Sequence, residues 1–114
     1  MDHVEVPLAG TVPFRVTHDL TVPRLPGVYL FHDLRGVLYV GRTDDLRQRF
    51  TQHYWAQANP RLLLALIRPV GDLFFSWCQA SARKQIDLER RLIRAFEPPC
   101  NRQQYRRRGP RRKP

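Results

Sequence analysis

Two runs of β-branched and aromatic residues flank a short polar turn, and this pattern limits what the chain can fold into. The runs are residues 28–31 and 37–40, and the turn between them is residues 33–36. An aspartate at the first turn position and a glycine at the fourth favour a type I turn closed by a left-handed residue. The segment is therefore predicted to form a β-hairpin with a bulged three-residue loop.

The register of this hairpin decides which side chains share a face of the sheet. In the predicted register the facing pairs are Asp33 with Val37, Phe31 with Tyr39, and Tyr29 with Gly41. Side chains alternate between the two faces along a strand, so Tyr29 and Tyr39 are expected on one face.

Capping residues and prolines divide the rest of the chain. The other expected elements are an edge strand at 14–17, a helix from Asp44 to about Tyr54 capped by Thr43, a helix at 61–68 after Asn59 and Pro60, a strand at 73–79, and a helix from Ser81 to before Pro98. The sequence thus predicts an N-terminal extension at 1–25, a domain at 26–101 and a tail at 102–114.

The charge of the chain points to a polyanionic partner. The 114 residues hold 20 Lys and Arg against 10 Asp and Glu, for a formal charge of +10. Positive charge is concentrated in the tail, which we expect to be disordered and to contact phosphates without reading sequence. The tail residues expected to contact nucleic acid are Arg106, Arg107, Arg108, Arg111, Arg112 and Lys113.

Several other classes of protein do not fit the sequence. The longest apolar run, residues 62–67, is too short to span a membrane. The acidic N-terminus lacks the features of a secretory signal, and two cysteines make no disulfide framework. We therefore expect a cytoplasmic protein with reduced thiols and no structural zinc site.

The last expected helix carries an acid in an unusual place. Ile86, Ile93 and Phe96 form an apolar stripe at helical spacing, and Glu89 falls inside that arc. An acid that faces a core must be paired, protonated or bound to a metal. A structural ion pair with an arginine and a metal site both remain open.

A cation and a histidine share one face of the earlier helix. Arg49 and His53 are four residues apart, beside the expected buried positions Leu46, Phe50 and Tyr54. A snorkelling arginine or a core histidine would give the same pattern. Together with Glu89 and the two tyrosines, however, they supply the groups that phosphodiester hydrolysis needs.

These residues and their order resemble the GIY-YIG nuclease family. Gly27-Val28-Tyr29 is similar to the first family tripeptide and Tyr39-Val40-Gly41 to the second, with valine in place of isoleucine in both. The resemblance runs from about Pro26 to Asn101. It implies an α/β (α+β) fold, a three-stranded antiparallel sheet flanked by helices, and a free-standing single domain of the family.

The resemblance also implies a role for each residue. Glu89 would be the sole carboxylate ligand of one Mg²⁺, which Mn²⁺ could replace, and Tyr29 would bind and deprotonate the attacking water. His53 would accept the proton of Tyr29 or orient it, and Tyr39 would contact the scissile phosphate. The remaining expected site residues are Arg49, which neutralises phosphoryl charge, Asn101, which steadies the site, and Arg42, which contacts phosphate.

Three functions follow from this resemblance and stay open. The first is a metal-dependent endonuclease that acts on DNA as a repair or recombination, mobile-element or phage enzyme. It is expected to recognise structure or strandedness rather than sequence, or to have little specificity. The others are a nucleic-acid-binding module without activity and an RNase or toxin-like nuclease. None needs a small-molecule cofactor or a membrane, and the oligomeric state stays undetermined.

Overall fold

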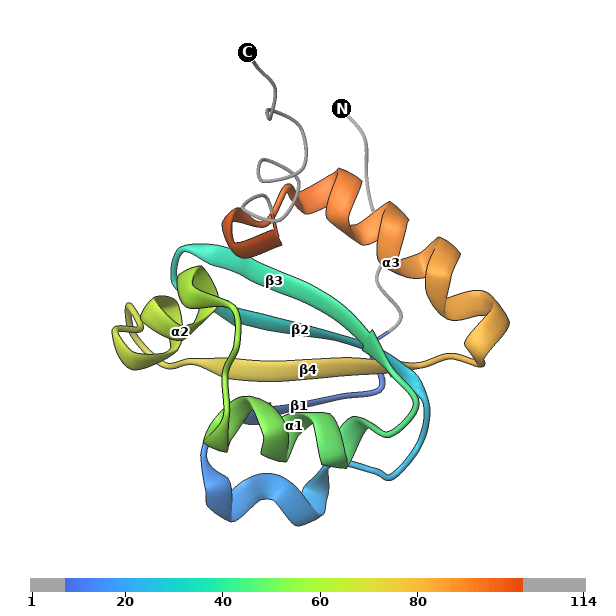
Figure 1. Cartoon of the computed structure of the whole chain (residues 1–114), viewed down its shortest axis with the longest axis horizontal. Helices are drawn as coiled ribbons and strands as arrows, with labels where there is room; N and C mark the ends of the chain where they lie inside the picture. Colours follow the sequence, from blue (N-terminus) through green and yellow to red (C-terminus); the bar gives the residue numbers. More distant parts are fainter. Residues whose placement is uncertain (1–7, 102–114) are drawn as a thin grey trace.

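The protein is described by a computed structural model that covers residues 8–101, shown in Figure 1. Four strands form one antiparallel sheet in the order β1-β4-β2-β3. The strands are β1 (Gly10–Pro13), β2 (Gly27–Asp33), β3 (Gly36–Thr43) and β4 (Phe74–Gln79). The helices are a 3₁₀ helix η1 (Val16–Thr21), α1 (Leu46–Trp55), α2 (Pro60–Ile67) and α3 (Ala82–Phe96). None of the helices in this part of the chain is long and apolar enough to cross a membrane.

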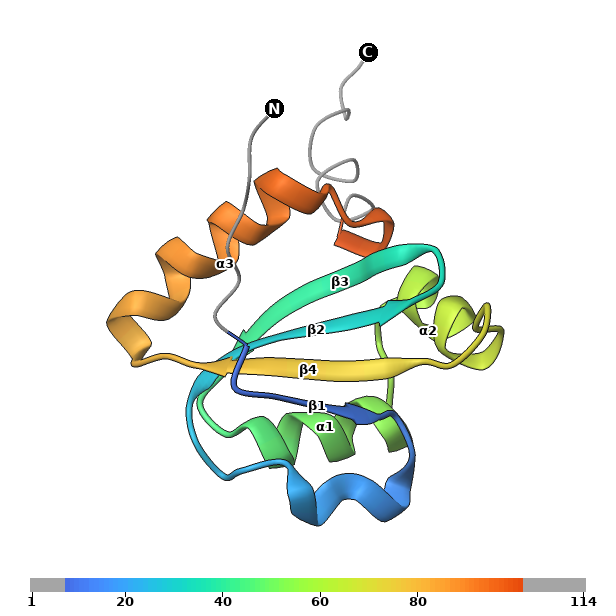
Figure 2. The ribbon, with the colours of Figure 1, turned by 180° about the vertical axis from the view of Figure 1, so that it is seen from behind.

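Helices cover both faces of the sheet, as Figures 1 and 2 show. On one face, α1, α2 and η1 enclose a core that contains Tyr29, Phe31 and Phe75. On the other face, α3 packs over β2 and β3 on a smaller cluster that includes Val40 and Leu92. The α+β class with an antiparallel sheet is therefore confirmed, although the sheet has four strands rather than three.

The additional strand comes from the N-terminal segment. We expected an edge strand at 14–17, but the strand is β1 and it pairs with β4. Pro13 ends it, and Phe14 turns into the core, where its ring lies 4.8 Å from that of Phe31 and 4.9 Å from that of Phe50. The expected position was wrong because the aromatic core takes up Phe14 and the chain then winds into η1.

The hairpin has the expected register at the tyrosines but a different turn. Tyr29 faces Gly41 and Phe31 faces Tyr39, whereas Asp33 faces Gly36 instead of Val37. The connection is thus two residues long, and a bulge in β3 opposite the step from Phe31 to His32 takes up the extra residue. The Asp33 carboxylate accepts hydrogen bonds from the backbone N–H of Arg35 at 2.8 Å and of Val70 at 2.9 Å, which holds the tighter turn.

The cap of α1 also differs from the expectation. Asp45 is the N-cap, and its carboxylate accepts a hydrogen bond from the Gln48 N–H at 3.1 Å. Thr43 is buried at the end of β3, where its hydroxyl accepts a hydrogen bond from the Asp45 N–H at 3.1 Å. Thr43 therefore shapes the connection that leads into α1, and Asp45 rather than Thr43 caps the helix.

The buried face of α3 matches the expected apolar stripe only in part. Ile93 packs on the smaller core cluster as expected, whereas Ile86 and Phe96 are 42% and 39% exposed. Gln85 and Leu92 are buried on this face. The Gln85 side chain donates hydrogen bonds to the Thr43 carbonyl at 3.0 Å and to the Ala80 carbonyl at 3.1 Å. These two bonds fix the first turn of α3 on the sheet, and they rotate Ile86 outward.

Candidate active site

The side chain of Tyr29 reaches from an inner strand to the edge of the sheet. Tyr29 is buried on β2, and its neighbour Gly41 lies on β3, the edge strand. A Cβ at Gly41 would collide with the hydroxyl end of Tyr29. The absence of a side chain at Gly41 is therefore what allows the phenol to lie across β3.

Helix α1 places a histidine side chain next to this hydroxyl. His53 Nε2 forms a hydrogen bond of 2.8 Å with Tyr29 Oη, and the imidazole ring lies 6.0 Å from the ring of Tyr39. Burial and, to a lesser extent, the positive charge of Arg49 together lower the pKa of His53 to about 4. His53 is thus a neutral imidazole at physiological pH.

The second tyrosine lies beside the first, as the hairpin register predicts. The rings of Tyr29 and Tyr39 are 6.2 Å apart. Burial raises the pKa of both phenols, and the charge of Glu89 contributes to the rise in both. Arg49 opposes this effect at both hydroxyls, so its guanidinium is close enough to stabilise a negative charge on either one.

Glu89 approaches the same edge of the sheet from the opposite face. Its carboxylate accepts a hydrogen bond of 3.1 Å from Arg42 Nε, and the Glu89 and Arg42 side chains are 22% and 49% exposed. The acid lies at the rim of the buried face of α3 rather than within an apolar arc. The ion pair that the sequence left open is present, and its arginine is the residue we expected to contact phosphate.

Asn101 holds the backbone of the edge strand. Its side-chain amide donates to the Val40 carbonyl at 2.9 Å, and its carbonyl oxygen accepts from the Val40 N–H at 2.8 Å. Val40 stands between Tyr39 and Gly41, so these two bonds fix the strand at the two positions that shape the site. Asn101 is buried.

Seven expected residues of the described chain therefore meet around Gly41. Tyr29, Tyr39, Arg49 and His53 lie on the α1 side of the sheet, Glu89 with Arg42 lies at its edge, and Asn101 braces β3. The basic residues of the tail lie outside the described part of the chain.

Sequence reasoning missed Gln57, which lies in the irregular segment after α1. Its side chain is hydrogen bonded to His53 Nδ1, and its other amide atom accepts a hydrogen bond from the Asn59 N–H at 3.0 Å. A spacing of four residues places two side chains side by side only within a helix. Because α1 ends at Trp55, this spacing does not predict the contact between His53 and Gln57.

Comparison with known proteins agrees with this geometry. A sequence model of the UvrC-like GIY-YIG domain matches residues 25–102. The chain belongs to this family. Its relatives include the UvrABC system protein C of Methanothermobacter thermautotrophicus, 33% identical over 88 residues that make up 76% of this chain and 15% of the relative. The corresponding protein of Gemmatimonas aurantiaca is 40% identical over 84 residues, which are 70% of this chain and 13% of that protein.

A solved structure shows the same fold as this GIY-YIG domain. It is the N-terminal endonuclease domain of UvrC from Thermotoga maritima, bound to magnesium as its catalytic divalent cation. It matches with a TM-score of 0.60 and 21% identity over 74% of this chain and 91% of that one. The present chain thus spans about one seventh of the full-length relatives but nearly all of this isolated domain.

The donor set of this GIY-YIG domain fits one hard divalent cation. Mg²⁺ keeps several waters and binds proteins through one or two carboxylates together with phosphate oxygens. The Glu89 carboxylate is partly exposed, and the half-exposed Arg42 that covers it can move away. Within residues 8–101, no three His, Cys, Asp or Glu side chains are grouped closely enough to hold an ion. A cation at Glu89 would therefore not meet a cluster of three such side chains within these residues.

Proposed function

We propose that this GIY-YIG domain is a metal-dependent endonuclease that hydrolyses phosphodiester bonds of DNA. The observation that carries the proposal is the meeting of Tyr29, Arg49 and Glu89 at one edge of the sheet, from three elements and from both faces. These residues supply a group for proton transfer, a fixed positive charge and a metal ligand. Residues that only stabilise a hydrophobic core would not require this combination of a proton-transfer group, a positive charge and a metal ligand.

Hydrolysis requires that water adds to phosphorus while the P–O ester bond breaks. We assign Tyr29 the task of positioning the water and taking its proton, so that the products are a phosphomonoester and a hydroxyl group. Tyr39 contacts the scissile phosphate, and Arg49 stabilises the charge that develops on the phosphoryl oxygens. His53 contacts the Tyr29 hydroxyl and sets its orientation or receives its proton.

Glu89 would hold one Mg²⁺, with Mn²⁺ as a substitute. When bound, the ion would neutralise phosphate charge and lower the pKa of the attacking water and of Tyr29. That contribution matters here because burial keeps the pKa of Tyr29 above its ordinary value. Since Glu89 is the one acid among the site residues assigned above, and no cluster of three candidate ligands is found within residues 8–101, we propose a one-metal mechanism.

Substrate binding would use charge rather than base contacts. Arg42 lies beside Glu89 and is half exposed, so it can exchange its carboxylate partner for a phosphate. The arginines and lysine of the tail, 106–108 and 111–113, would add further phosphate contacts. We therefore propose selection by structure or strandedness of DNA, in repair or recombination in the cytoplasm.

One incubation series tests the proposal. Labelled single-stranded, duplex and branched DNA and a matched RNA are mixed with the full chain and Mg²⁺, Mn²⁺ or chelator. We expect internal cleavage of DNA that needs a divalent cation. Binding of all substrates without cleavage would favour an inactive module, in which the Glu89–Arg42 ion pair is permanent. Preferential cleavage of RNA would favour an RNase.

A further inference from the structure

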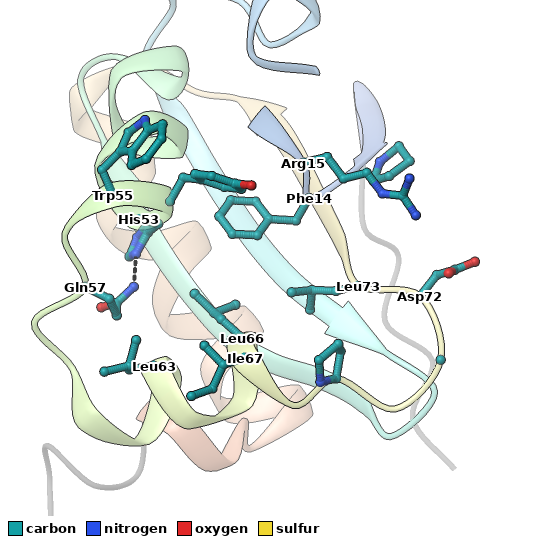
Figure 3. A pocket seen from close by; sticks show the side chains of 14 residues that line it. Phe14, Arg15, His53, Trp55, Gln57, Leu63, Leu66, Ile67, Asp72 and Leu73 are labelled. Atoms are coloured by element: carbon teal, nitrogen blue, oxygen red, sulfur yellow. Dashed lines mark hydrogen bonds between the residues drawn. The ribbon is translucent and has the colours of Figure 1, made fainter. Parts of the chain in front are cut away.

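Three hydrogen bonds form a chain that ends at the hydroxyl of Tyr29. The backbone N–H of Asn59 donates to Gln57 Oε1 at 3.0 Å. The other amide atom of Gln57, Nε2, is bonded to His53 Nδ1, as the dashed line in Figure 3 shows. His53 Nε2 then meets Tyr29 Oη at 2.8 Å. Gln57 has no role in the function proposed above.

The first bond fixes the direction of all the others. A backbone N–H can only donate, so the atom of Gln57 that faces it must be the carbonyl oxygen. The amide nitrogen of Gln57 therefore faces His53, and an amide nitrogen can only donate. Nδ1 of His53 must accept this bond, which means that it carries no proton.

The protonation of Nε2 follows from that of Nδ1. A neutral imidazole carries one proton, and with Nδ1 as acceptor that proton is on Nε2. Nε2 then donates to Tyr29 Oη, and the proton of the phenol points away from the imidazole. In this arrangement His53 has no free lone pair toward Tyr29.

We propose that Gln57 is a positioning residue that holds His53 as the Nε2–H tautomer, so that His53 donates to Tyr29 instead of accepting its proton. The proposal rests on the endonuclease function and decides between the two roles given to His53 above. Tyr29 keeps a hydrogen-bond donor when it is a phenolate, and its own proton passes to a solvent water at the sheet edge near Gly41 rather than to His53.

The groups around His53 agree with a neutral imidazole. Arg49 lies one turn earlier on α1, Tyr29 and Tyr39 face the ring from β2 and β3, and Phe31 packs edge-on against it at 5.1 Å. Each of these groups is a cation, a neutral phenol or an apolar ring. Burial and Arg49 keep the pKa of His53 at about 4, so the ring carries one proton at neutral pH.

Gln57 lies on the outer side of His53, where substitution has room. A cavity of about 430 Å³ adjoins both residues, between α1, α2, the end of β1 and the segment before β4 (Figure 3). Its charged lining residues are Arg15 and Asp72, on the wall opposite His53 and Gln57. A glutamate at position 57 therefore fits without crowding the core.

The protonation of His53 can be measured without any substrate. In ¹⁵N-labelled protein, two-bond couplings to the ring protons distinguish a protonated imidazole nitrogen from a bare one. At pH 7 we expect His53 to show a protonated Nε2 and a bare Nδ1, and we expect Gln57→Glu to lose this pattern. A bare Nε2 in the unmodified protein would overturn the proposal.

Cleavage as a function of pH provides a second readout. A carboxylate at position 57 cannot donate, so His53 must present N–H at Nδ1, and its pKa rises. Above that pKa, His53 of Gln57→Glu no longer donates to Tyr29, and single-turnover cleavage is expected to fall by about tenfold or more. Below it, the imidazolium donates from both nitrogens and the rate recovers. The control is Gln52→Glu, which adds the same charge at an exposed position of α1.

The two measurements separate the two proposals. A Gln57→Glu protein with an unchanged pH profile of cleavage would show that the tautomer of His53 does not matter for the reaction. The proposed positioning role of Gln57 would then be refuted. If the unmodified protein cleaves no nucleic acid, the endonuclease function falls, while the tautomer is still decided by the NMR measurement.

Discussion

The hydroxyl group of Tyr29 lies directly over Gly41 of the neighbouring strand. This contact joins the two tripeptides of the family motif, because the glycine of the second makes room for the tyrosine of the first. The proposed catalytic hydroxyl of Tyr29 is thereby held at the edge of the sheet, while the ring stays buried on an inner strand.

Gly41→Ala tests this relationship. The added methyl group must displace the Tyr29 hydroxyl, so we expect cleavage to be lost to the same extent as in Tyr29→Phe, with a stability cost of about 1–3 kcal/mol from overpacking. Adding Tyr29→Phe to Gly41→Ala should then cause little further loss of rate. Single-turnover cleavage of the two single variants and the double variant measures this. Rate losses that multiply would mean that Gly41 acts independently of Tyr29.

Glu89→Gln is expected to abolish cleavage and to leave DNA binding largely intact. The substitution removes the carboxylate that would hold the divalent ion and keeps the shape of the side chain. Asp87→Asn is the matched control, because Asp87 is an exposed acid on the same helix that pairs with Arg91. Cleavage and filter binding in Mg²⁺ measure both properties. Normal turnover by a folded Glu89→Gln protein would contradict the assigned site.

Two arginines of α1 are expected to behave in opposite ways. Arg49→Ala should cost about 2–4 kcal/mol in transition-state stabilisation, as for the loss of one charge-stabilising donor, with little change in melting temperature. Arg47 donates to the backbone carbonyls of Val22 at 2.8 Å and Leu20 at 3.3 Å, so Arg47→Ala should lose about 1–2 kcal/mol of stability and keep its activity. Kinetics and thermal unfolding of both variants check this. If Arg49→Ala unfolds instead, the role of Arg49 is to stabilise the fold rather than the transition state.

Arg42 is expected to contact the substrate backbone. Arg42→Gln should weaken DNA binding and lower the slope of log affinity against log salt by about one, which is the effect of one lost phosphate contact. Arg91→Gln is the control, since Arg91 is another exposed arginine paired with a carboxylate of α3. Binding isotherms across a salt series distinguish the two. An equal slope for Arg42→Gln and the unmodified protein would restrict Arg42 to its ion pair with Glu89.

The depressed pKa of His53 predicts how stability responds to acid. The folded protein holds its pKa at about 4, below the ordinary value of 6.5, because the ring is buried next to Arg49. Between these two values the unfolded chain binds more protons than the folded one, so stability must fall as the pH drops from about 6.5 toward 4. His53→Gln removes this group, and its free energy of unfolding should fall less over that range. Urea unfolding at several pH values compares the two, and parallel curves would show that His53 is not buried as a neutral ring.

In the hairpin, the sequence predicts the strand register correctly but not the turn. Strand patterns and alternation suffice to place Tyr29 opposite Gly41 and beside Tyr39, and the structure agrees. The turn itself could not be predicted, because its tight form depends on a hydrogen bond that the Val70 N–H, 37 residues further on, donates to the Asp33 carboxylate. The bulge in β3 then compensates for the shorter loop and restores the register.

The orientation of α3 and the role of Gln57 depended on tertiary structure. Hydrophobic spacing favoured Ile86 as a buried residue, yet the hydrogen bonds of Gln85 to two backbone carbonyls decide which face of α3 meets the sheet. Gln57 approaches His53 from an irregular segment, for which helical spacing makes no prediction. Hydrogen bonds of polar side chains outside regular spacing are the features that single-sequence patterns do not reveal.

The amide of Asn101 has a consequence for how this domain can be joined to others. An asparagine side chain offers the same donor and acceptor as a peptide unit, and at Val40 it occupies the positions that a fifth strand would use. The middle of the exposed sheet edge is therefore already capped, and neighbouring strands cannot extend the sheet across the catalytic edge. The cap comes from residue 101 itself. A segment fused after that residue leaves the edge protected, whereas a fusion that replaces it would open the edge to another strand.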